Sequence, residues 1–165
     1  MMFKFFFRLL FLALSSVAIV LVSCSDKREF YNETQKFEGD LEWKKSDVKL
    51  FEIPIEQTNE KCEMLLSFRC ATGFLYDKML IRMIETAPDG RQVDRLIEMP
   101  VRNDKGEFYG DKGFDIVDIE FPLDLAKSFD MKGIWKFSFT QEMPFEESVD
   151  FPMELGVILR HPKNG

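Results

Sequence analysis

Few residues of this sequence could carry out acid–base or nucleophilic chemistry. The sole histidine, His161, lies four residues from the end of the sequence beside a proline, where chains usually fray. Without a second histidine, neither a Ser-His-Asp nor a Cys-His arrangement can form around a stable base. Zinc is unsuited for the same reason, because its protein sites draw on Cys and His. The sequence therefore predicts no catalytic residue, no metal site and no cofactor.

Carboxylates are plentiful and could bind calcium or form an acid–base pair. They gather in two segments, one with Glu142, Glu146, Glu147, Asp150 and Glu154 and the other with Asp115, Asp118 and Glu120. Calcium loops need several oxygen ligands on a tight, turn-rich backbone, and this spacing does not provide one. We favour a solvated acidic loop, with calcium binding and catalysis as the alternatives.

One cysteine lies where a covalent modification is expected. Lys4 and Arg8 precede an apolar run over 9–22, which suits a secretory signal peptide and is shorter than the ~20 residues of a membrane-spanning helix. The run ends in Leu21-Val22-Ser23-Cys24, which resembles the lipobox of bacterial lipoproteins. The resemblance implies cleavage of residues 1–23, a diacylglyceryl group on Cys24, and stable anchoring by at least two acyl chains. An uncleaved N-terminal anchor is the alternative.

The mature chain is acidic and has the length of one domain. Cleavage removes two positive charges, so the formal net charge falls from −7 to −9 over the remaining 142 residues. Such a domain repels phosphates, which excludes nucleic acid as a partner. We expect a lipidated tether over 24–29 and a single domain over 30–161.

The other two cysteines, Cys62 and Cys70, share parity in one apolar stretch. In an extended strand they would lie roughly 26 Å apart, at ~3.3 Å per residue, whereas a disulfide needs Cα atoms closer than ~7 Å. We therefore expect two buried free thiols on the face of Met64, Leu66 and Phe68.

Apolar residues recur with a period of two after residue 45, which is typical of β-strands. Pro54 indicates an edge strand or a bulge, and Pro122 should end a strand, with a helical turn following over 124–129 behind Asp124. The expected strands cover residues 51–55, 62–70, 76–86, 93–101, 115–121, 135–140 and 155–159. Turns between them, such as Pro88-Asp89-Gly90, recur about every ten residues. The pattern predicts an all-β fold, a single antiparallel β-sandwich of jelly-roll or immunoglobulin-like type.

Aromatic residues outside this alternation are candidates for stacking on a sugar or a partner protein. They are Trp43, Tyr76, Phe108 and Tyr109. Trp135 instead shares its parity with Phe137 and Phe139, so we expect it in the core. Phe108 and Tyr109 lie between two turns and form the candidate partner-binding loop. Packing of this pair onto a sandwich end is the commoner outcome and stays the alternative.

Several motifs resemble, in order, those of the gliding motility lipoprotein GldH family of the Bacteroidota. They are Phe30-Tyr31, Trp43 followed by 47–53, Ser67-Phe68-Arg69 followed by Tyr76 and Leu80, 104–113 (DKGEFYGDKG), 133–143 (GIWKFSFTQEM) and 155–157 (LGV). The fourth is similar to the family's D-x-G-x-W-x-G-x-G and the fifth to its G-x-Y-x-F-x-x-x-Q-x-M. Phe108 and Pro144 depart from the pattern, since the family tends to have tryptophan and arginine there.

The resemblance implies a β-sandwich lipoprotein without catalytic residues, associated with gliding machinery and, through it, with the type IX secretion apparatus. We therefore expect a membrane-anchored, non-enzymatic accessory lipoprotein of the cell envelope, at the outer membrane in preference to the inner. A carbohydrate-binding β-sandwich lipoprotein is the alternative. An exposed aromatic platform would favour the alternative, and a broad apolar patch or an exposed strand edge would favour the accessory lipoprotein.

Overall fold

The computed structural model describes residues 28–37, 39 and 41–163, so the expected signal peptide and Cys24 lie outside the described residues. Within these ranges the chain forms strands and no helix, and none of it has the length and hydropathy of a helical membrane span. The strands are β1 (Glu29–Lys36), β2 (Glu42–Lys44), β3 (Lys49–Ile55), β4 (Cys62–Ala71), β5 (Lys78–Thr86), β6 (Gln92–Pro100), β7 (Asp111–Lys112), β8 (Ile116–Lys127), β9 (Gly133–Gln141), β10 (Ser148–Asp150) and β11 (Pro152–Arg160).

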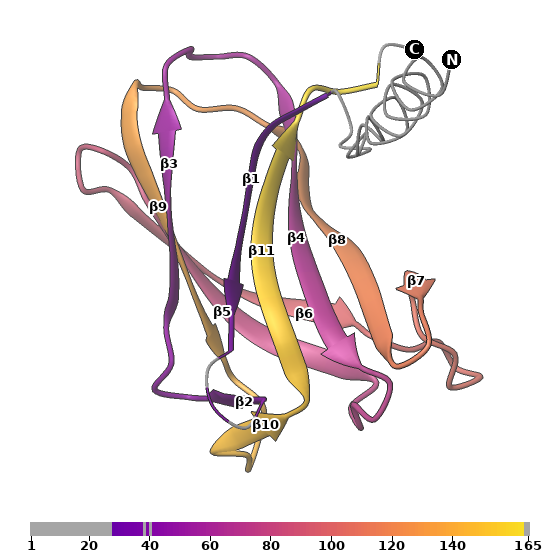
Figure 1. Cartoon of the computed structure of the whole chain (residues 1–165). Coiled ribbons are helices and arrows are strands. Elements are labelled where there is room, and N and C mark those ends of the chain that lie inside the picture. Colours follow the sequence, from indigo (N-terminus) through magenta and orange to yellow (C-terminus); the bar gives the residue numbers. More distant parts are fainter. Residues whose placement is uncertain (1–27, 38, 40, 164–165) are drawn as a thin grey trace, which may run out of the picture.

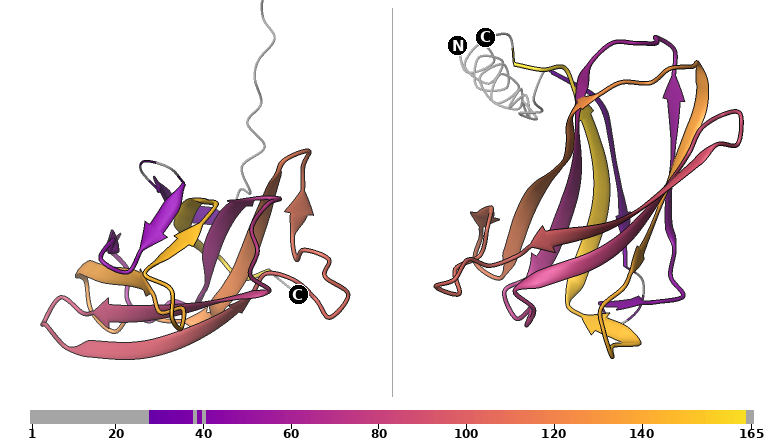
Figure 2. Two further views of the ribbon diagram at one scale, coloured as in Figure 1. Left: turned by 90° about the horizontal axis from the view of Figure 1, so that it is seen from below. Right: turned by 180° about the vertical axis from the view of Figure 1, so that it is seen from behind.

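The strands form two main antiparallel sheets that face each other (Figures 1 and 2). One sheet has the order β1-β11-β4-β8-β7, the other has the order β3-β9-β5-β6, and β10 and β2 form a small separate ladder. The predicted antiparallel β-sandwich is confirmed. Pro54 lies on β3, an edge strand of the second sheet, where a missing backbone donor is tolerated.

Alternating apolar side chains from both sheets fill the space between them. Trp135, Phe137 and Phe139 of β9 are all buried, as the alternation predicts. The Phe139 ring meets the Phe51 ring edge-on at 5.8 Å between centroids, and the Phe129 ring meets the Trp135 ring at 5.1 Å. Edge-to-face pairs of this kind add to the stability that burial alone gives.

The prediction that Pro122 ends a strand and a helical turn follows over 124–129 is wrong. β8 continues to Lys127, and its pairing with β4 shifts register between Met64 and Leu65, where Leu123 is an extra residue. A bulge of this kind absorbs the proline. Beyond its short ladder with β7, β8 has no second neighbour, so the proline's missing N–H leaves no acceptor unsatisfied.

The two cysteines lie at opposite ends of β4, and both are buried and free, as the spacing predicted. Burial is the main reason why the pKa values of the thiols rise, to about 11 for Cys62 and about 12 for Cys70. The Cys62 thiol also donates to the Lys127 carbonyl oxygen at 3.5 Å. Both groups are therefore protonated at neutral pH and poor nucleophiles.

The start and the finish of the sandwich lie at one end, and its long connections lie at the other. At one end, here called the proximal end, β1 begins and β11 finishes, with Glu29 paired to Arg160 (Figure 1). At the opposite, distal end lie the connections 72–77, 101–115 and 142–151. Backbone hydrogen bonds join them, since Thr72 donates to Asp115 at 2.9 Å and Ala71 to Phe151 at 3.0 Å. The sandwich thus begins and finishes at one end, and three long connections gather at the other.

Candidate functional site

The residues that could have formed a catalytic or metal site are engaged elsewhere. His161 lies at the proximal end, where its ring packs 4.8 Å from the ring of Phe30 and its backbone N–H donates to the carbonyl oxygen of Arg28. Within the described part of the chain, no three His, Cys, Asp or Glu side chains group so as to hold a metal ion. The candidate sites are therefore surfaces.

Several of the clustered carboxylates belong to ion pairs across the five-stranded sheet. Arg69 on β4 forms a two-pronged pair with Asp118 at 2.6 and 3.1 Å and approaches Glu154 at 3.5 Å. Arg160 on β11 is paired with Glu120 on β8. These contacts tie β8, β4 and β11 together side by side. The remaining carboxylates of 142–150 project at the distal end.

The predicted partner-binding loop is a small, well-braced hairpin. Arg102 and Phe108 pair as an isolated antiparallel bridge, and the Asn103 side-chain oxygen accepts from the backbone N–H groups of Lys105 and Glu107 at 2.9 and 3.0 Å. Gly106 closes the turn with a φ of 77°, which suits glycine. The loop is thus a shaped element on a rigid scaffold.

The two aromatic residues of this loop have different environments. The Arg102 guanidinium lies 4.0 Å above the Phe108 ring and donates to the Phe74 carbonyl oxygen at 2.6 Å. Phe108 is half-buried and packs against the core, whereas 46% of Tyr109 is exposed. Adjacent residues of an extended segment point to opposite sides, so Phe108 holds the loop in place and Tyr109 is available for contact.

The other aromatic candidates contribute to packing. Trp43 is fully buried, with its ring 5.0 Å from the Phe37 ring and its indole N–H donating to the Asp47 carbonyl oxygen at 2.9 Å. The expectation that Trp43 is exposed is therefore wrong. Tyr76 is half-buried, with its ring 5.5 Å from that of Phe74. Burial, followed by the carboxylates of Glu146 and Asp150, raises the pKa of its hydroxyl.

Sequence reasoning missed the most exposed apolar side chains of the distal end. Phe114 and Phe145 are fully exposed, as are 76% of Leu75 and 41% of Phe151. Phe145 and Phe151 have positive φ values of 64° and 69°, uncommon for bulky residues. A sequence signal existed for Phe145, which lies beside a proline in an acidic stretch without strand alternation. An apolar residue outside any strand alternation has no predicted core face, so its exposure could have been expected.

One hollow of the surface contains an internal ion pair. It has a volume of about 620 Å³ between β1 and β3 and is lined partly by Lys36, Asp47 and Lys49. The Lys49 ammonium donates to the Asp47 carboxylate at 2.9 Å and to the Lys36 carbonyl oxygen at 3.0 Å. The buried Lys49 ammonium is therefore already matched inside the hollow and is not available to a ligand.

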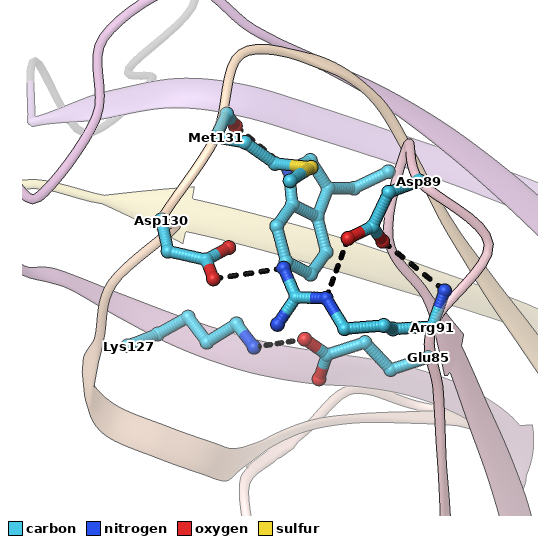
Figure 3. A network of polar contacts seen from close by, with 7 residues as sticks. Glu85, Asp89, Arg91, Lys127, Asp130 and Met131 are labelled. Atoms are coloured by element: carbon cyan, nitrogen blue, oxygen red, sulfur yellow. Dashed lines mark hydrogen bonds and ion pairs between the residues drawn. The ribbon is translucent and has the colours of Figure 1, made fainter.

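A polar network joins the β5–β6 turn to the connection between β8 and β9 (Figure 3). Arg91 bridges Asp89 at 2.6 Å and Asp130 at 2.8 Å, and beneath it Lys127 pairs with Glu85. The Arg91 hydrogen bonds hold the pKa of Asp89 below its usual value. Because each of these groups is matched by an opposite charge, the network serves to hold the two sheets together.

A comparison with models of protein families identifies the family of the chain. The family model described as GldH lipoprotein matches residues 29–157. The chain belongs to the GldH lipoprotein family. The match runs from the first residue of β1 into β11 and so covers the sandwich. A search of curated proteins found no relative that matches. The resemblance drawn from the motifs is confirmed, and the GldH-family protein is a lipoprotein of gliding-motility type.

Two glycines of the family-like motifs are explained by packing in this GldH-family protein. A Cβ on Gly110 would lie 2.1 Å from the Asp118 carbonyl oxygen, because the loop backbone lies directly against β8. A Cβ on Gly156 would lie 2.5 Å from the Ser67 hydroxyl oxygen and 2.8 Å from the Glu33 carbonyl oxygen. These glycines permit close approach of neighbouring strands, so their role is to form the fold.

Proposed function

We propose that this GldH-family protein is a non-enzymatic accessory lipoprotein of the cell envelope, anchored to a membrane through lipids on Cys24. The observation that carries the proposal is the family match over a complete β-sandwich that begins five residues after a lipobox cysteine. Five residues reach at most ~18 Å when extended. The sandwich therefore stays close to its membrane, which raises its effective concentration toward a partner there.

The chemistry of the domain supports a binding role without catalysis. The two described thiols are buried and protonated, and the histidine ring packs on Phe30. The buried charged pair of Lys127 and Glu85 is internally matched. These thiols, the imidazole and the buried amine are side chains of the kinds that often act as nucleophile or base. Here the thiols are buried, the imidazole packs on Phe30 and the amine pairs with Glu85, and so these groups stabilise the fold.

The proposed partners are envelope proteins of the gliding or type IX secretion machinery, with the outer membrane as the membrane of residence. The candidate contact loop is the hairpin with Phe108 and Tyr109. It projects at the distal end, away from the end where the lipidated segment enters. Loops on a rigid scaffold are where binding residues concentrate. In this arrangement Phe108 fixes the loop and Tyr109 contacts the partner.

Replacement of Cys24 tests the anchor. Cys24→Ser should abolish labelling of the protein by an alkyne fatty acid fed to the cells, because the thiol that carries the lipid is gone. Cys62→Ala, which removes a cysteine outside the lipobox, should be labelled like the wild-type protein. If Cys24→Ser is labelled as the wild type is, the anchor is not this cysteine and the lipoprotein mechanism fails.

Carbohydrate binding is the second candidate function. Tyr109 and Phe114 are both exposed on the connection 101–115, and exposed rings can stack on sugars. Binding of the purified domain to cell-surface glycans, lost in Tyr109→Ala with an intact thermal midpoint, would favour this function over protein binding. Absence of glycan binding by the wild-type domain would exclude it.

A further inference from the structure

Three apolar side chains project at the distal end, on the connections 72–77 and 142–151. Phe145 is fully exposed, and 76% of Leu75 and 41% of Phe151 are exposed. Isolated apolar residues are common on surfaces, but a group of them at one place marks an interaction site. The backbone N–H of Ala71, the last residue of β4, donates to the Phe151 carbonyl oxygen at 3.0 Å, and the Tyr76 hydroxyl bonds to the Glu146 carboxylate, so the two connections are neighbours.

The connection that carries Phe145 is held in a fixed shape. The fully buried side chain of Gln141 accepts from the Met143 backbone N–H at 2.8 Å and donates to the carbonyl oxygens of Glu146 and Glu147 at 3.4 Å. Phe145 itself has a φ of 64°, a conformation that persists in bulky residues only when the surroundings impose it. The backbone that carries the exposed ring is therefore held in one conformation.

The charge around these side chains is predominantly negative. Residues 137–159 contain no Lys, Arg or His, and four carboxylates lie within the connection, at Glu142, Glu146, Glu147 and Asp150. The neighbouring segments compensate only in part. Residues 41–50 carry Lys44, Lys45 and Lys49 against Glu42 and Asp47, and the three cations of the connection 101–115 face four carboxylates. The apolar group therefore has a net negative rim.

We infer that Leu75, Phe145 and Phe151, with their acidic rim, form a docking surface for a protein whose matching face has an apolar pocket edged by Lys and Arg. Opposite charges across an interface steer association and select the partner. The inference rests on the proposed function and specifies the chemistry of the partner. A membrane is disfavoured as the occupant, because the carboxylates would repel anionic headgroups.

The position of this surface suits a partner beyond the anchoring membrane. β11 runs from the distal end to the proximal end in nine residues, so the surface lies about 30 Å from the point where the lipidated segment enters. Photo-crosslinking in native cells tests the inference with the full-length lipidated protein. A benzophenone side chain is placed at position 145, 75 or 109. Position 96 is the control, because Leu96 is 64% exposed on the outer face of the four-stranded sheet, on β6.

We expect positions 145 and 75 to give one discrete adduct with an envelope protein, whose cross-linked peptide contains Lys or Arg. Glu147→Lys combined with Asp150→Lys should lower the yield from position 145 by at least about tenfold. The same reversal at the proximal end, Glu56→Lys with Glu60→Lys, should leave it unchanged. Phe145→Ala should lower the yield from position 75 similarly, whereas Phe114→Ala, an equally exposed ring on the neighbouring connection, should not.

Several results would overturn the inference. An adduct with lipid at position 145 would make this a membrane contact, and adducts of equal yield from position 96 would make it non-specific. An adduct that survives both charge reversal and Phe145→Ala would show that neither the rim nor the ring is recognised. An adduct from position 109 without one from position 145 would refute this surface and leave the proposed accessory function standing.

Discussion

The Lys127 ammonium donates to the Glu85 carboxylate inside the sandwich, where both side chains are more than nine-tenths buried. Lys127 ends β8 and Glu85 lies on β5, so the pair joins the two sheets. The rings of Phe129, Trp135 and Phe137 lie 5.2 to 5.7 Å from the ammonium, and Arg95 approaches Glu85 at 3.7 Å. Burial alone disfavours the charged form of Lys127. The ion pair with Glu85 and the three aromatic rings together stabilise its positive charge.

Removal of one partner of this pair should destabilise the fold strongly. Lys127→Met leaves the Glu85 carboxylate buried with Arg95 as its remaining cation, and we expect a loss of about 3 kcal/mol in the free energy of unfolding. Lys127→Met combined with Glu85→Gln should recover most of that loss. Urea titration measures both.

An exposed ion pair provides the control for this experiment. The Lys136 ammonium lies 2.7 Å from the Glu52 carboxylate, with about half of each side chain exposed. Lys136→Met should change the free energy of unfolding by less than about 1 kcal/mol. Equal effects of Lys127→Met and Lys136→Met would show that the buried pair does not hold the sheets together.

Close approach of the loop backbone to β8 gives a second prediction. Gly110 and Gly90 both have a φ of 88°, but a Cβ on Gly90 would meet nothing within 4 Å, whereas one on Gly110 would lie 2.1 Å from the Asp118 carbonyl oxygen. Both alanine variants carry the same backbone strain. Gly110→Ala should therefore lose about 1–3 kcal/mol more than Gly90→Ala in a denaturant titration. Equal losses would mean that the loop does not lie against β8.

The candidate loop yields a third prediction, which separates its two aromatic residues. Phe108→Ala removes a half-buried ring from beneath the Arg102 guanidinium and should lower the free energy of unfolding by about 1–3 kcal/mol. Tyr109→Ala should change it by about 0.5 kcal/mol or less, because nearly half of Tyr109 is exposed. If Tyr109→Ala unfolds as readily as Phe108→Ala, both rings belong to the core and the loop offers no contact residue.

Alternation in the sequence was sufficient to predict the central strands and the edge strands β3 and β6, but not the edge strand β1. β4 and β9 carry apolar residues at every second position, because one face of each strand packs into the core while the other is more exposed. β1 has the sequence EFYNETQK and lies at the edge of its sheet, where most of its side chains meet solvent. No alternation is imposed on such a strand, so its pairing with β11 could not be predicted from its residues.

The distal surface could be predicted only in part for a related reason. The loop with Phe108 and Tyr109 could be predicted from the turn residues around it, because turn residues act through local backbone conformation. Which of the two rings is half-buried could not be predicted, because Phe108 packs under Arg102, and Arg102 in turn bonds to the distant Phe74. That the connections with Leu75 and Phe145 are neighbours likewise depends on contacts between residues far apart in the sequence, such as Tyr76 with Glu146, which a local pattern does not contain.

Burial of the two thiols gives the last prediction, a loss of stability at alkaline pH. Desolvation raises the pKa values of Cys62 and Cys70 to about 11 and about 12, whereas a thiol in an unfolded chain titrates near 8.5. Between these values the unfolded chain releases protons that the folded protein retains, so stability present below pH 8.5 is lost as the pH rises. Between pH 8 and pH 9.5, below the range where tyrosines titrate, the loss should be about 1 kcal/mol for each thiol. Urea titrations at the two pH values measure it, and Cys62→Ala with Cys70→Ala should flatten the difference. Rapid alkylation of either cysteine in the native protein at pH 8 would instead show that the thiols are accessible and that the premise is wrong.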